Sequence, residues 1–79
     1  MNILRIKGAT RTLGEAQGYQ ALPVRDIVVN DEAAGEECNA METAWMPSPE
    51  EMDRLYRGEP IVVQILGRAH PPIMLRVGD

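Results

Sequence analysis

The chain has 79 residues, a formal net charge of −4, 44% hydrophobic residues and no phenylalanine. A chain of this length forms one domain and buries only about 60–65% of the surface that its unfolded form exposes, so a free energy of unfolding of a few kcal/mol is expected. No apolar run approaches the roughly 20 residues of a transmembrane helix, and the N-terminal residues lack the hydrophobic region of a signal peptide. These features predict a soluble protein of the cytoplasm.

Charges are segregated along the sequence. No Lys or Arg lies between residues 26 and 53, yet this window holds nine of the 12 Asp and Glu residues. Its formal charge is −9, and the rest of the chain, with three acids and eight bases, carries +5. An acidic run of this kind is ordinarily a solvated face that keeps a protein soluble. The alternative is a docking surface for a strongly basic partner, and the separation of the two signs adds some weight to it.

Other binding chemistry finds little support in the residues. The basic residues are dispersed without aromatic residues between them, which disfavours direct nucleic-acid binding. The adjacent acids at 36–37 and 50–51 do not fit the spacing of a calcium-binding EF-hand loop, so no metal and no other cofactor is expected. The single Cys38 excludes an intramolecular disulfide and a Cys-based zinc site. It is either a plain free thiol or a site of oxidative dimerisation in vitro.

The N-terminal half is predicted to contain two strands. Residues 2–7 (NILRIK) have the composition of a short strand, and residues 22–29 (LPVRDIVV) are rich in β-branched residues. Pro23 confines the start of the second strand to an edge. The stretch 8–19 between them is expected to be a loop, and its glycine spacing fits neither phosphate-binding motif. The acidic stretch at about 30–41 is expected to be a mobile loop.

The clearest local signal predicts one helix at residues 49–57. Ser48 is a favourable N-cap, and Pro49 suits the first helical position. Glu51 stands three residues after Ser48 and completes a capping box. Gly58 is expected to end the helix.

Three further strands are predicted around this helix. Residues 41–46 (METAWM) precede it and are expected to insert Trp45 into the core. Residues 60–66 (PIVVQIL) and 72–77 (PIMLRV) follow it and are the clearest strand candidates, joined by GRAHPP. This order predicts an α+β fold, in which a small, mostly antiparallel sheet of four to five strands packs against one short helix.

His70 is the only histidine, and no nucleophile or second base stands at a telling spacing from it. General base catalysis requires a positioned partner and a substrate cleft. His70, Pro71 and Pro72 are therefore predicted to shape a turn, and the chain is not expected to be an enzyme.

The stretches ATRTLG...GY..LPVRD and AW.PSPEEMDRL..GEPIVVQILGRAHPPIMLRVG resemble a family of small proteins from phages and prophages of alphaproteobacteria. In that family a Trp-x-Pro-Ser/Thr-x-Glu-Glu helix start precedes an apolar strand and a Gly-x-x-His-Pro-Pro turn. The resemblance covers most of the chain. The positions that match are Trp45, Pro47, Glu50, Glu51, Leu55, Gly58, Gly67, His70, Pro71 and Pro72.

The resemblance implies a phage protein that acts inside the host bacterial cell. Some acidic phage proteins of this size are anti-CRISPR proteins, which occupy the nucleic-acid-binding surface of a CRISPR–Cas complex. The expected function is an inhibitor of this type, a DNA mimic that binds Cas subunits of a type I effector complex and blocks target DNA binding. The expected contact residues are Asp31, Glu32, Glu36, Glu37, Glu42, Glu50 and Asp53. Structural roles are expected for Trp45, Ser48, Glu51, Gly58, His70, Pro71 and Pro72.

A phage structural or assembly protein is the alternative. Such a protein would bury its exposed sheet edges in a homo-oligomer. The sequence leaves the oligomeric state open between a monomer and a weak homodimer, because short or charged strand edges keep a small sheet monomeric.

Overall fold

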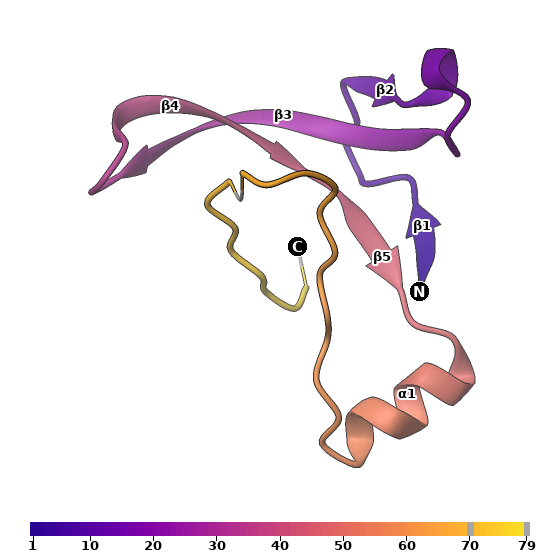
Figure 1. Cartoon of the computed structure of the whole chain (residues 1–79). Coiled ribbons are helices and arrows are strands. Elements are labelled where there is room, and N and C mark those ends of the chain that lie inside the picture. The colour runs from indigo at the N-terminus through magenta and orange to yellow at the C-terminus, as the bar shows by residue number, and fades with distance from the viewer. Residues whose placement is uncertain (70, 79) are drawn as a thin grey trace.

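The structure, a computed structural model, describes residues 1–69 and 71–78 of the chain (Figure 1). Its elements in chain order are β1 (Asn2–Leu4), β2 (Arg11–Leu13), the 3-10 helix η1 (Glu15–Gln17), β3 (Leu22–Asp31), β4 (Gly35–Glu42), β5 (Ala44–Met46) and α1 (Pro49–Tyr56). The predicted α+β class, with a small antiparallel sheet and one short helix, is confirmed. No helix of the described residues is long and apolar enough to cross a membrane.

The strands form two small antiparallel sheets. β1 pairs with β5, with Ile3 opposite Trp45, and the second sheet has the order β2-β3-β4. β3 and β4 make a long hairpin that projects from the rest of the molecule (Figure 1). Pro23 pairs with Thr12 of β2, whereas the pairing of β3 with β4 starts only at Arg25. Pro23 therefore lies where β3 still has one free edge, as the missing N–H of proline requires.

Two segments predicted as loops contain strands. The stretch 8–19 includes β2 and η1. The acidic stretch 30–41 is not a loop, because β3 runs to Asp31, a short turn follows, and β4 begins at Gly35. Along β4 every second residue, Cys38, Ala40 and Glu42, is half-buried. This period of two is typical of a strand. The strand is not evident from hydrophobicity, because the residues at these positions are small or charged.

The predicted helix is confirmed as α1, which ends at Tyr56, one residue earlier than expected. The capping box is present in both directions. The Ser48 Oγ accepts the N–H of Glu51 at 3.2 Å, and the Glu51 carboxylate accepts the N–H of Ser48 at 2.9 Å. Gly58 follows with φ of 90°, the left-handed conformation that glycine adopts without strain.

The strands predicted at 60–66 and 72–77 are wrong. The described residues of the segment from 59 to 78, here called the C-terminal segment, form neither helix nor strand. This segment leaves α1, runs back along the molecule and folds in front of β4 without joining a sheet (Figure 1). Strand formation depends on a hydrogen-bonding partner as well as on composition. His70 lies outside the described residues, so the turn predicted there is not described.

The core is very small. Ile6 and Val24 are the buried hydrophobic residues of the described chain. Trp45, expected in the core, is 46% exposed on the two-stranded sheet of β1 and β5. The radius of gyration is 14.4 Å, whereas a compact domain of this length has about 11.6 Å. The chain is thus an open framework rather than a closed globule.

Candidate functional site

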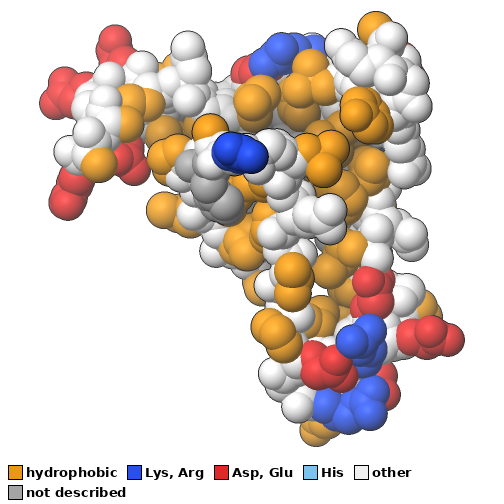
Figure 2. Space-filling view, viewed as in Figure 1, with side chains coloured by type: hydrophobic (Ala, Val, Ile, Leu, Met, Phe, Trp, Pro, Cys, Tyr) orange, Lys and Arg blue, Asp and Glu red, His pale blue; other side chains and the backbone are white. Residues whose placement is uncertain are grey.

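The far end of the β3–β4 hairpin gathers four acidic residues and no basic one. These residues, here called the acidic tip, are Asp31, Glu32, Glu36 and Glu37. All four are exposed. Figure 2 shows them as a red cluster at the end of the arm, well apart from the helix. Four of the seven predicted contact residues are therefore brought together on one projecting element.

Side chains of the hairpin itself hold the turn in shape. The Asp31 Oδ1 accepts the N–H groups of Ala34 and Ala33 at 3.0 and 2.9 Å. These two hydrogen bonds lower the pKa of Asp31, because they stabilise its charged form. The Asn30 side-chain oxygen accepts the N–H of Glu37, a residue with φ of 54°. The backbone of the tip is thus fixed by its own polar groups.

Charge at the tip is not neutralised by the residues that the structure describes. No ion pair of the described residues engages Glu32, Glu36 or Glu37. One carboxylate oxygen of Asp31 accepts hydrogen bonds within the turn, but Asp31 keeps its negative charge. A rigid backbone with several uncompensated carboxylates is suited to a basic partner, since little conformational entropy is lost when it binds.

The other three predicted contact residues lie elsewhere. Glu50 and Asp53 are on α1, which stands at the opposite end of the molecule from the tip (Figure 1). Asp53 forms an ion pair with Arg57 one turn along the helix, at 3.3 Å. Glu42 is at the base of the hairpin and is engaged inside the chain. These residues do not form one surface with the acidic tip.

Glu42 links three parts of the chain. One carboxylate oxygen lies 2.7 Å from the Arg25 guanidinium of β3, and the other lies 2.7 Å from the Arg76 guanidinium of the C-terminal segment. Hydrogen bonds from Arg76 and then Arg25 lower the pKa of Glu42. The Glu42 side chain is only 16% exposed. This contact joins residues 34 apart in the sequence, and no local signal in the sequence announces it.

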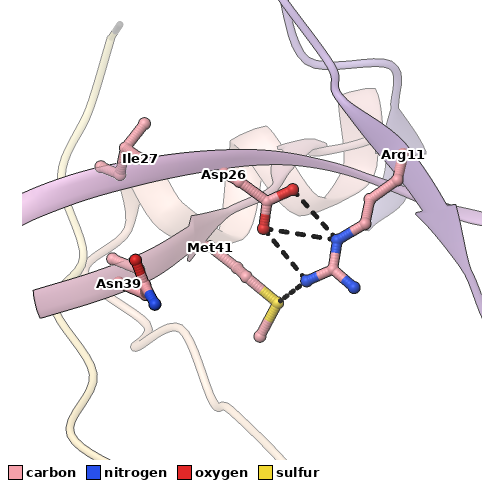
Figure 3. Close-up of a pocket in the computed structure, with 6 residues that line it drawn as sticks. Arg11, Asp26, Ile27, Asn39 and Met41 are labelled. Atoms are coloured by element: carbon pink, nitrogen blue, oxygen red, sulfur yellow. Dashed lines mark hydrogen bonds and ion pairs between the residues drawn. The ribbon is translucent and has the colours of Figure 1, made fainter.

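A shallow depression of about 530 Å³ lies beside the hairpin (Figure 3). The Arg11 guanidinium binds both carboxylate oxygens of Asp26, each at 3.0 Å, and approaches the Met41 sulfur. The hydrogen bond from Arg11 and that from Thr10 lower the pKa of Asp26. Because Arg11 and Asp26 satisfy one another, the depression offers no free charged group to a ligand.

One surface was not predicted from the sequence. It is an open apolar face, here called the apolar face, whose exposed side chains include Trp45, Met52, Val62, Met74 and Leu75. The hairpin, α1 and the C-terminal segment surround an open hollow of about 2320 Å³. Exposed apolar side chains occupy much of the middle of the molecule between the hairpin arm and the helix (Figure 2). The apolar runs at 60–66 and 72–77 carry the signal for this face, but their composition also predicts strands of an internal sheet.

Among the residues that the structure describes, no three His, Cys, Asp or Glu side chains come together to hold an ion. Cys38 is half-buried on β4, and its thiol contacts the backbone oxygen of Gly35 at 3.1 Å.

Fold and surfaces together define a small α+β protein with two candidate docking surfaces, the acidic tip and the apolar face. Comparison of the chain with protein-family models, with characterised proteins and with solved structures found no match. The assignment of function therefore depends on the surfaces themselves.

Acid is expected to destabilise the fold. A hydrogen bond from the N-terminal ammonium lowers the pKa of Glu51 from 4.5 to about 2, and the pKa values of Asp26, Glu42 and Glu59 are also lowered. A carboxylate with a lowered folded-state pKa stabilises the fold above its unfolded pKa, and this stability is lost as the pH falls toward the folded value. Thermal unfolding followed by circular dichroism should give a melting temperature that is steady down to about pH 5 and falls between about pH 4.5 and 2.

Glu51→Gln is the control for this pH dependence. It should melt at a lower temperature at neutral pH and lose less stability across the same acidic range. A melting temperature that rises on acidification would contradict the prediction.

Proposed function

We propose that the protein works by binding, without catalysis, and that the acidic tip docks onto a basic surface of a partner protein. The observation that carries this proposal is that no ion pair among the described residues engages Glu32, Glu36 or Glu37, on a turn whose backbone is fixed by side-chain hydrogen bonds. Elsewhere in the charged window, Asp26, Glu42 and Asp53 are paired with arginines of the chain. The carboxylates left for a partner are thus concentrated at one end of the molecule.

The particular function that we propose is a phage inhibitor of the anti-CRISPR type. A nucleic-acid-binding complex presents rows of Lys and Arg that normally contact phosphates. A narrow hairpin with closely spaced carboxylates can enter such a path and compete with DNA for it. The resemblance to small phage proteins supports this form of the proposal, and a Cas effector complex of type I is the partner to test first.

The test measures how the protein competes with target DNA for a purified type I effector complex. Glu32→Lys/Glu36→Lys reverses two charges at the tip and leaves Asp31 and the positive-φ residue Glu37 untouched. Its apparent inhibition constant should rise about tenfold or more, because like charges would then face each other across the contact. Inhibition by the unaltered protein should weaken as salt is raised.

Glu15→Lys/Glu50→Lys is the matched control. It changes the net charge by the same amount at two exposed acids away from the tip. This variant should inhibit nearly as well as the unaltered protein. Equal losses in both variants would show that only net charge matters, and unchanged inhibition in the tip variant would refute the proposed contact.

A phage structural or assembly protein is the second candidate. The observation that favours it is the open apolar face, since a subunit that completes its core on assembly exposes such a face when alone. This candidate predicts a homo-oligomer of defined size and the presence of the protein in purified virions.

A further inference from the structure

The C-terminal segment exposes apolar side chains on both of its sides. Val62 is 81% exposed and its neighbour Val63 is 45% exposed. Met74 and its neighbour Leu75 are 85% and 64% exposed. Neighbouring side chains of an extended chain point to opposite sides. A half-buried strand would have one polar side, whereas a continuous apolar run is typical of a strand covered on both faces. The segment therefore has the composition of a buried strand and lacks the cover.

The solvent-accessible area of the chain shows how much more surface it exposes than a compact monomer does. The chain exposes 7111 Å², whereas a compact monomer of 8.8 kDa exposes about 4,800 Å². The excess is about 2,300 Å² for each chain. Two chains that buried this excess against each other would bury about 4,600 Å² in total, which lies within the range of about 2,000–5,000 Å² for obligate homodimers. The excess exposed area thus matches the area that a second copy would bury.

Charge also favours a second copy over a charged partner. The described residues lining the hollow include five basic and four acidic ones: Arg5, Lys7, Arg25, Arg54, Arg76, Asp31, Glu42, Glu51 and Glu59. The wall is thus close to neutral. Two such faces can meet without like-charge repulsion, whereas a strongly basic or acidic partner would gain little from it.

We propose that two copies of this chain associate through the apolar face, and that the C-terminal segment of each copy is covered by the other. Free edges for strand pairing are available, since β4 and β5 each have a neighbour on one side only. Val62, Met74 and Leu75 lie at the centre of the contact with Trp45 and Met52, all of which line the hollow. Obligate homodimer interfaces are apolar in this way and resemble a divided domain core.

The inference deepens the second candidate function and does not depend on the acidic tip. Of the acidic tip, Asp31 lines the hollow, whereas Glu32, Glu36 and Glu37 do not. A dimer would therefore carry two sets of these three carboxylates outside the contact. The variant Glu32→Lys/Glu36→Lys should remain dimeric. Failure of the tip contact and failure of self-association are thus separate results.

Sedimentation equilibrium of the full chain tests the proposal. The unaltered protein should sediment with twice the chain mass at tens of micromolar. Val62→Glu/Met74→Glu places two carboxylates at exposed positions of each copy, so the monomer loses no buried contact. The dimer dissociation constant should rise by about 100-fold or more, since carboxylates would be buried against apolar side chains.

Tyr19→Glu/Tyr56→Glu is the matched control, because both tyrosines are exposed and neither lines the hollow. It should remain dimeric. Hydrogen exchange supplies a second measurement: amides of residues 61–66 and 73–77 should be protected in the dimer and exchange faster on dilution. A monomeric protein, a dimer that survives both double substitutions, or aggregates without a fixed size would each overturn the proposal.

Discussion

Val24→Asp is expected to unfold the protein. Val24 is 1% exposed, and with Ile6 it makes up the buried hydrophobic core of the described residues. A carboxylate at this position would have no cationic partner in that core and would lose its hydration, at a cost of about 3 kcal/mol or more. That cost is comparable with the whole free energy of unfolding of a domain this small. Far-UV circular dichroism and urea denaturation should show loss of the cooperative transition.

Val28→Asp is the matched control for this substitution. Val28 lies on the same strand, four residues on, and is 63% exposed. It should change the free energy of unfolding by less than about 0.5 kcal/mol. Val24→Ala is a milder variant that should still fold and should lose about 2 kcal/mol. If the two aspartate variants were equally stable, Val24 would not be the centre of the core.

Local signals explain which elements could be predicted from the sequence. The start of α1 is encoded by neighbours, because Ser48, Pro49 and Glu51 form the cap among themselves. β3 could be predicted from its β-branched residues. The hairpin was harder, since the partner strand β4 is rich in acids and presents only small residues, such as Cys38 and Ala40, at alternate positions.

The remaining differences come from interactions that no short stretch encodes. Residues 60–66 have the composition of a strand, but a strand requires a partner edge, and none of the described strands pairs with them. The burial expected for Trp45 required cover from distant parts of the chain, and Trp45 is 46% exposed. The strands predicted at 60–66 and 72–77 and the predicted burial of Trp45 are therefore wrong for the same reason. Apolar side chains of the described residues remain exposed instead of packing against one another.

The candidate site likewise contains residues that the sequence predicts correctly and one that depends on a distant contact. Charge composition alone located the acidic tip, because no base lies near enough in sequence to pair with Glu32 or Glu36. It also assigned Glu42 to the contact surface, although Arg76 reaches Glu42 from 34 residues away. A lack of basic residues nearby in the sequence therefore predicts an unpaired acid correctly only where the fold places no distant basic residue beside it.

Glu42→Gln is expected to lower stability far more than Asp53→Asn. Both changes remove one negative charge without altering the shape of the side chain. Glu42 holds two arginines and is 16% exposed, whereas Asp53 holds one and is 68% exposed. Loss of the Glu42 charge leaves the Arg25 and Arg76 guanidinium groups close together without their shared counterion, while an exposed helical pair contributes little. The urea midpoint should therefore fall several-fold further for Glu42→Gln.

A double-substitution cycle separates the ion-pair network from a simple loss of packing. Arg76→Gln alone should be mild, because Arg25 still neutralises Glu42. Added to Glu42→Gln it should restore part of the lost stability, since it removes one of the two positive charges that Glu42 holds together. Strictly additive effects would mean that Arg76 and Glu42 act independently, and the C-terminal segment would then be held against β4 by its apolar side chains alone.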